Sequence, residues 1–272
     1  MDKPKKIRNP RNQIKIDRSA TKIHCILRFN DPKPGNEPIK AKFTEVDGTE
    51  VTVQIRGWKT GDNEANLVGL MHRMVSLGDT YGMWEDGKTR KLCQVMARTL
   101  DRQAEEDWRE LMEDLDDDWE EENQKGKFIR MLQGLGSATF GPKAFKEQCK
   151  FMKDGKIKIP ETNLRAGTNR LIQINKLLPY LGIGAKSFSI QDLNEIIVKS
   201  LPPKAYKKYV GDGGDELDDL TAIKDLMSTI DAKLDLKREV AALEEEEKRI
   251  TSPKQKSHQG TDKPKLSNII RS

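Results

Sequence analysis

Acidic side chains gather at two places where their oxygens could bind a divalent cation. The first is Asp116–Asp118 with Glu120–Glu122, and the second is GDGGDELDD at Gly211–Asp219. A Ca²⁺ site needs oxygens that converge on one point, which EF-hand loops achieve with a glycine-punctuated spacing of about 12 residues. Neither run has that spacing. We expect a solvated helix end and loop at the first place, and a turn followed by an acidic helix N-cap at the second.

The other residue types that carry chemistry are scattered along the chain. The histidines stand in no HExxH or CxxC…H spacing: His24, His72 and His258. The glycine pairs are not followed by the GK[ST] of a phosphate loop: Gly134/Gly136 and Gly182/Gly184. No GxSxG nucleophile motif occurs. We therefore expect no enzyme, no catalytic residue, no metal and no cofactor, and we disfavour a metal-dependent hydrolase built on the acidic cluster.

Positive charge is concentrated at both ends of the chain. The 272 residues carry a net charge of +5, with 35% hydrophobic and 34% charged residues. The candidate nucleic-acid-binding residues lie in these ends: Lys3, Lys5, Lys6, Arg8, Arg11, Lys254, Lys256, Lys263 and Lys265. The stretch from Asp101 to Glu122 between them is acidic. Such ends can contact polyanions such as RNA, or attract other copies of the chain. The alternative is a solvated terminus that only keeps the protein soluble.

The cysteines and the hydropathy indicate where in the cell the protein is expected to lie. Cys25, Cys93 and Cys149 form no CxxC pair and no even-numbered disulfide framework, which favours a reducing, cytoplasmic setting. No apolar run approaches the ~20 residues of a membrane span. The basic N-terminus lacks the apolar centre of a signal peptide. We expect neither a membrane nor a small-molecule substrate as partner.

The elements that would position these residues begin with a β-rich region at 23–57. IHCILRF at Ile23–Phe29 is a strand candidate, and two further runs flank Asp47-Gly48, a strong hairpin signal. Val51, Val53 and Ile55 alternate with polar residues, so one face is apolar. An isolated hairpin is marginal in water. This one therefore needs a partner, either the adjacent helices or the same hairpin of another subunit.

Helical periodicity follows over residues 58–153. The pattern predicts five short helices: one after Asp62, then Lys88–Leu100, Glu105–Trp119, one marked by Phe128–Leu135, and Lys143–Lys153. We expect Gly134, Gly136 and Gly141-Pro142 to break the chain after the fourth. Trp108 and Trp119 lie on the apolar stripe of the third helix and are predicted core residues. Trp84 lies in the loop YGMWEDG and is a candidate interface residue.

A second helical region is predicted over residues 154–247, after a boundary at Lys153–Gly155. Asn163–Tyr209 reads as two amphipathic helices with a stop at Pro202-Pro203, because proline lacks an N–H and clashes with the preceding turn. A long helix then spans Asp219–Lys248, and its charged later part, Val240–Arg249, is expected to project into solvent. With disordered basic ends at 1–22 and 248–272, the fold class is mainly α: two small helical domains preceded by a β-hairpin.

The order of these patterns resembles the capsid region of Gag from long-terminal-repeat retrotransposons. The matching segments cover roughly 58–247: Gly61-Asp62 before the Leu67–Leu77 helix; Lys91–Leu100 followed by Ala104 and Trp108; Phe145–Met152; Arg170, Ile174-Asn175 and Leu178–Leu181; and Asp192–Ile197 with Leu201-Pro202. The chain departs from the family in having no CCHC zinc knuckle, which is either lost or encoded downstream in a longer polyprotein. The retroviral major homology pattern is not cleanly matched.

The resemblance implies a structural protein of two small helical domains that assembles into virus-like particles and encloses RNA. Lys and Arg in the ends would then neutralise phosphates without sequence preference. The hypothesis places a dimer contact at Gln191–Ser200 and larger ring contacts on the first domain near the hairpin at Val46–Ile55. Its candidate assembly residues are Trp84, Gln191, Asn194, Glu195 and Val198. The alternative is a domesticated, non-assembling Gag derivative that acts as a nucleic-acid-binding adaptor.

Overall fold

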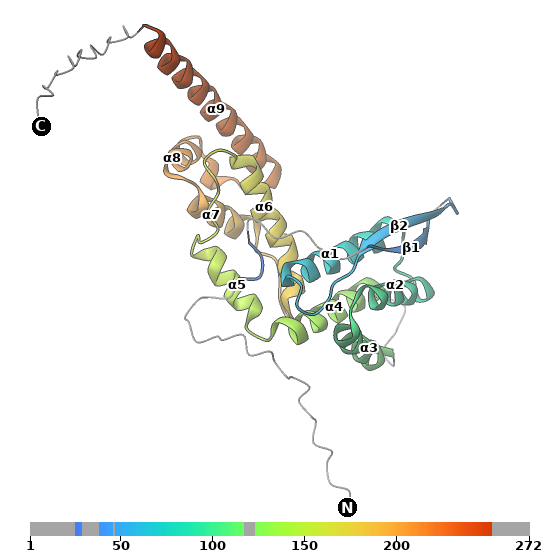
Figure 1. The fold of residues 1–272 in the computed structure, drawn as a ribbon. Helices are drawn as coiled ribbons and strands as arrows, with labels where there is room; N and C mark the ends of the chain where they lie inside the picture. Colours follow the sequence, from blue (N-terminus) through green and yellow to red (C-terminus); the bar gives the residue numbers. More distant parts are fainter. Residues whose placement is uncertain (1–24, 29–37, 46, 117–122, 252–272) are drawn as a thin grey trace, which may run out of the picture.

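The computed structural model describes residues 25–28, 38–45, 47–116 and 123–251. These residues form a mainly helical protein with one small β-hairpin (Figure 1). The fold class predicted from the sequence is confirmed at that level. Of the ends predicted as disordered, residues 1–22 and 252–272 lie outside the described part, whereas residues 248–251 are helical.

The hairpin forms where Asp47-Gly48 predicts it. β1 (Pro38–Thr44) pairs antiparallel with β2 (Glu50–Arg56), with Phe43 opposite Val51 and Ala41 opposite Val53. Gly48 has φ +88°, a left-handed conformation that glycine adopts without steric cost. Phe43 is buried and stacks on Tyr81, with 4.9 Å between ring centroids. The apolar face of the hairpin is therefore covered by helices of the same chain.

The strand expected at Ile23–Phe29 is not present in its described part. Cys25–Arg28 has no strand pairing, although Cys25, Ile26 and Leu27 are buried. The side-chain amide of Gln148 replaces a neighbouring strand: its Oε1 accepts from Leu27 N at 2.9 Å, and its Nε2 donates to Leu27 O at 3.0 Å. The N–H and the carbonyl of Leu27 are thus both hydrogen-bonded without pairing to another strand.

Five helices follow the hairpin, close to the predicted ranges: α1 (Glu64–Thr80), α2 (Asp86–Thr99), α3 (Arg102–Asp116), α4 (Gln124–Phe140) and α5 (Ala144–Lys153). Trp108 on α3 is fully buried, as predicted, and packs edge-on against Phe128 on α4. Its Nε1 donates to Cys93 O on α2 at 3.1 Å. One tryptophan therefore ties three helices together. The predicted core role of Trp119 lies outside the described residues.

The prediction that Gly134 and Gly136 break the chain is wrong, because α4 runs through both to Phe140. Both glycines lie where another segment approaches the helix closely. A Cβ at Gly136 would lie 2.1 Å from the backbone oxygen of Tyr180, and one at Gly134 would lie 2.7 Å from Leu111. The small residues therefore serve packing and do not end the helix. The helix ends at Gly141, which has φ +84°.

The second helical region starts at α6 (Leu164–Leu177), which continues into the 3₁₀ turn η2 (Leu178–Leu181). The remaining elements are α7 (Ile190–Ser200), α8 (Pro203–Gly211), η3 (Gly214–Glu216) and α9 (Leu220–Thr251). The Pro202-Pro203 stop is confirmed, since α7 ends and α8 begins there. The predicted acidic cap is also confirmed, because Asp219 Oδ2 accepts from Ala222 N at 2.7 Å.

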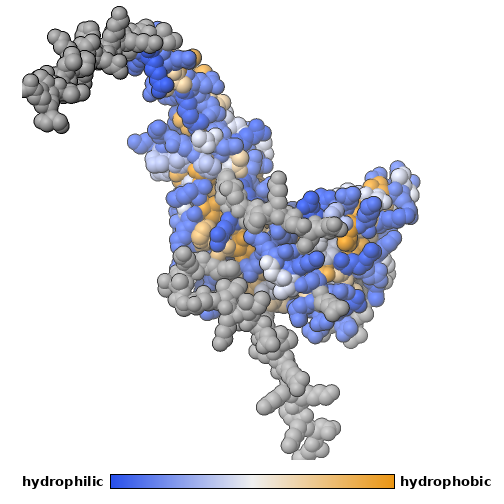
Figure 2. Space-filling view, in the orientation of Figure 1, coloured by the Kyte–Doolittle hydropathy of each residue, from blue (hydrophilic) through white to orange (hydrophobic). Residues whose placement is uncertain are grey.

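The buried side chains of both helical regions form one continuous cluster. η2 provides much of this continuity, because it contacts α1, α4 and α5 as well as α6. α9 packs on α6 and α8 through its first half, with Leu234 as its last buried core residue. Beyond it the helix projects from the body (Figures 1 and 2), as predicted. Among the described residues, no helix is long and apolar enough to cross a membrane.

Candidate functional site

The candidate nucleic-acid-binding residues lie outside the described part of the chain: Lys3, Lys5, Lys6, Arg8, Arg11, Lys254, Lys256, Lys263 and Lys265. Their role remains a prediction from charge. The acidic run at 117–122 is also outside the described residues. The candidate assembly residues are all described, and they fall in two places, α7 and the turn after α1.

Three of the predicted assembly residues form one exposed face of α7. Gln191 and Glu195 are exposed and Val198 is half-buried. Their spacing of four and three residues puts them on the same side of the helix. Ser189 caps this helix by accepting from Asp192 N at 3.1 Å, and Glu195 pairs with Lys199 at 3.8 Å. The exposed face is therefore mainly polar, and Val198 at its C-terminal end is half-buried and packs against the core of the same chain.

Asn194 needs correction, because its side chain is 1% exposed and cannot meet another subunit directly. Its Nδ2 donates to the backbone oxygens of Gly214 and Leu217, at 2.8 and 2.9 Å. Its Oδ1 accepts from the buried Tyr209 hydroxyl at 2.9 Å. Asn194 is therefore a core residue that fixes η3 and α8 against α7. The helical pattern could not show this, because the partners lie 15 to 23 residues away.

Trp84 is half-buried and packs against its own chain. Its ring lies 5.7 Å from that of Phe128, and its Nε1 donates to Asp79 Oδ1 at 2.9 Å. Lys125 from α4 lies over the ring and bonds the same carboxylate at 2.5 Å. Burial raises the pKa of Asp79, but the hydrogen bonds from Lys125 and Trp84 outweigh it and hold this pKa below its ordinary value. The tryptophan thus links the α1–α2 turn to α4.

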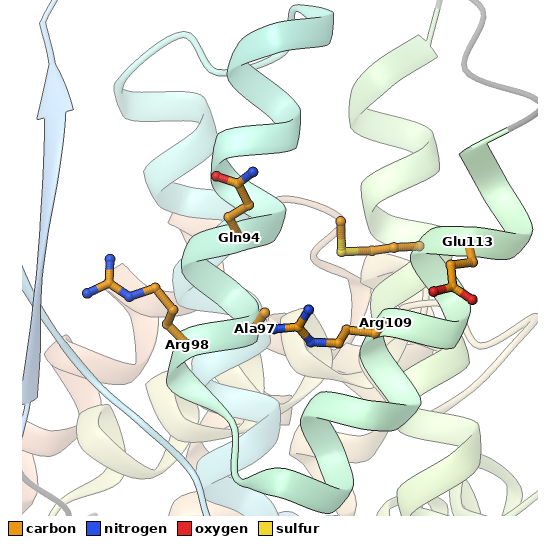
Figure 3. A pocket seen from close by; sticks show the side chains of 6 residues that line it. Gln94, Ala97, Arg98, Arg109 and Glu113 are labelled. Carbon is orange, nitrogen blue, oxygen red and sulfur yellow. The ribbon is translucent and has the colours of Figure 1, made fainter.

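A hollow of about 440 Å³ lies between α2 and α3, and its lining is Gln94, Ala97, Arg98, Arg109, Met112 and Glu113. Figure 3 shows Arg109 reaching from α3 toward Ala97, whereas Arg98 points away from α3. Arg109 is already paired with Glu105 at 2.6 Å. The hollow combines an apolar floor with a charged rim. The sequence analysis missed it, although Ala97 and Met112 on neighbouring helices were a usable signal.

Burial shifts the pKa values of two thiols and of the described histidine. Burial raises the pKa of Cys93 to about 12 and that of Cys149 to about 11, so both stay protonated at neutral pH and are poor nucleophiles. His72 on α1 faces Tyr180 on η2, with 3.5 Å from Nδ1 to the hydroxyl. Burial, assisted by Lys176, lowers the pKa of His72. Within the described ranges, no three His, Cys, Asp or Glu side chains gather as a metal site.

Comparison of the chain with models of protein families, with curated proteins and with solved structures gave no match. The α7 face and the basic ends remain predicted contact surfaces, and the structure describes only the first of them.

Proposed function

We propose that this protein is a Gag-like structural protein that self-assembles and packages RNA through its basic ends. The observation that carries the proposal is the arrangement of charge in the sequence. Residues 1–22 hold eight Lys and Arg against two Asp, and residues 248–272 hold seven against one Asp. Phosphate neutralisation by such segments gives RNA binding that is independent of sequence and sensitive to salt.

Buried polar side chains of the helical body hydrogen-bond the backbone of neighbouring segments, which supports the proposal. Gln148 binds the backbone of Leu27, Asn194 binds the η3 backbone, and Asn175 accepts from Phe188 N at 2.7 Å. Each of these side chains holds one segment against another. The body therefore presents rigid helix faces, of which the α7 face is the proposed contact between copies. Retrotransposon Gag capsids, which the sequence resembles, fit this description.

The experiment that tests RNA packaging is the salt dependence of binding to a fluorescent single-stranded RNA. Each phosphate contact contributes about −0.7 to the slope of log K against log salt for single strands. Replacing Lys3, Lys5, Lys6, Arg8 and Arg11 with Gln should therefore flatten the slope by up to about 3.5 and weaken binding for every RNA sequence.

The matched control replaces five exposed lysines of the body: Lys143, Lys146, Lys150, Lys186 and Lys207. It removes the same net charge, so the proposal expects a clearly smaller change of slope. Equal changes in the two variants would assign binding to overall charge and not to the ends. A salt-independent, sequence-specific interaction would contradict the proposal.

A further inference from the structure

The projecting half of α9 carries an apolar stripe with no cover from the described part of the chain. Leu236, Val240 and Leu243 are 62%, 48% and 65% exposed. They follow one another by four and then three residues, which is the d–a–d spacing of a coiled coil. They are not a continuation of the buried stripe that ends at Leu234, because Leu236 lies on a different side of the helix. Large side chains on a solvated helix mark an interaction site.

We propose that this stripe pairs with the same stripe of a second copy, and that the two α9 helices run antiparallel. The inference does not depend on RNA packaging, and it uses a surface that the proposed function leaves unassigned. The charged residues beside the stripe determine whether two α9 helices pair in parallel or antiparallel. With Leu236 and Leu243 at d and Val240 at a, the flanking e positions are Lys237 and Glu244, and the flanking g positions are Glu239 and Glu246.

A parallel pair would bring g against the e position of the next heptad. Glu239 of each copy would then face Glu244 of the other, and no pair of opposite charge would form. An antiparallel pair brings e against e and g against g. Lys237 of each copy then faces Glu244 of the second copy, while Glu239 faces Glu246. The antiparallel arrangement has two attractive pairs to offset two repulsive ones, so its electrostatic energy is lower.

The geometry of α9 allows a second copy to approach. All residues from Asp235 to Arg249 are exposed, and the helix extends away from the body (Figure 1). Arg238 near its base bonds Asp235 and the backbone oxygen of Glu161, which fixes where the helix leaves the body. In this register Val240 of each copy packs on Leu243 of the other, whereas Leu236 lies opposite Glu247, so the apolar seam is short. We therefore expect a reversible dimer whose population rises with concentration.

The test is sedimentation equilibrium of the full chain without RNA. Replacing Leu236 and Leu243 together with Gln, a good helix former, should raise the dimer dissociation constant at least about tenfold. The control is Ile183→Gln, since Ile183 is 78% exposed but lies in a turn far from α9 in sequence. Circular dichroism checks that α9 stays helical. An unchanged dissociation constant in the Leu variant, or a chain that is monomeric up to about 1 mM, would overturn the proposal.

Charge reversal tests the direction. In the antiparallel pair, Glu244→Lys places two lysines together and weakens the homodimer, and Lys237→Glu does the same with two carboxylates. A mixture of the two variants restores both attractive pairs, so it should dimerise more tightly than either variant alone. In a parallel pair, Glu244→Lys would instead face Glu239 and tighten the homodimer. Tightening in Glu244→Lys, or no recovery in the mixture, would overturn the antiparallel assignment.

Discussion

Gly136 lies at a close backbone contact between the two helical regions. Because a Cβ there would meet the Tyr180 oxygen at 2.1 Å, Gly136→Ala must move α4 and η2 apart. We expect it to lower the free energy of unfolding by about 1–3 kcal/mol, as overpacking does. Thermal and urea unfolding measure this change.

Gly69→Ala on α1 is the matched control for Gly136→Ala, because both glycines are helical but a Cβ at Gly69 meets nothing within 4 Å. It should raise stability by up to about 1 kcal/mol through helix propensity alone. Equal effects of the two substitutions would mean that the contact with η2 is not what requires glycine at position 136.

At Tyr209, the hydroxyl oxygen alone is expected to contribute measurably to stability. Tyr209→Phe keeps the ring, which is fully buried, but leaves Oδ1 of Asn194 without its 2.9 Å donor. An unsatisfied buried acceptor costs about 1–3 kcal/mol. The control is Tyr206→Phe, whose ring is 44% exposed and which should change stability by less than about 0.5 kcal/mol. A neutral Tyr209→Phe variant would show that Asn194 finds another partner.

At the scale of elements, the contact between Gln148 on α5 and the Cys25–Arg28 segment is the least regular part of the fold. Gln148→Ala would remove the two side-chain amide bonds to the Leu27 backbone and loosen the segment, which keeps the bonds from the Cys25 thiol to Leu27 O and from Arg170 to Arg28 O. Cys25, now 4% exposed, should then react with a thiol reagent about tenfold faster, since lost hydrogen bonds of about 1–3 kcal/mol shift the local opening equilibrium.

Peptide mapping after alkylation measures this reactivity, with buried Cys93 as the internal reference. Lys146→Ala, an exposed change on the same helix, should leave the rate unaltered. If Cys25 stays protected in Gln148→Ala, apolar burial of Leu27 and not the amide pair holds the segment.

The helices and the hairpin could be predicted because each is encoded locally. The apolar spacing of α1 and α7, the Asp47-Gly48 turn and the Pro202-Pro203 stop all act within a few residues. The predictions were wrong where the contacting residue lies far away in the sequence. Gly136 looks like a helix breaker until Tyr180 is placed beside it, and the Cys25–Arg28 segment looks like a strand until Gln148 takes the place of a neighbouring strand.

The candidate site was less predictable than the fold. Helical spacing put Gln191, Glu195 and Val198 on one face, but the same spacing could not tell Asn194 from an exposed residue, since its partners lie on η3 and α8. The hairpin shows a related limit. It needed a partner, and the choice between its own helices and another subunit was settled only by the contact of Phe43 with Tyr81. That contact removes the reason for placing the hairpin at a ring interface.

For the whole molecule, we expect His72, which contacts Tyr180 between the two helical regions, to make stability depend on pH. Its pKa is lowered in the folded chain, whereas the unfolded chain has the ordinary value of about 6.5. The unfolded state therefore binds more protons. The contribution of His72 to the free energy of unfolding is fully present above about pH 6.5 and is lost as the pH falls through the folded pKa.

His72→Gln should remove this part of the pH dependence of unfolding, which lies below about pH 6.5. Urea denaturation at a series of pH values measures it. A wild-type profile that is flat over this range, or a variant with the same slope as wild type, would show that His72 does not couple the two regions to pH.

We propose that copies of this chain contact one another through the α7 face and package RNA through their basic ends. Sedimentation velocity of the purified chain with single-stranded RNA at low salt tests it most directly. We expect fast-sedimenting particles that contain protein and RNA, and their loss in Val198→Asp, which puts a charge at the C-terminal end of the α7 face and whose fold is checked by circular dichroism. A protein that binds RNA without forming any species larger than a dimer would contradict assembly and leave a nucleic-acid-binding adaptor.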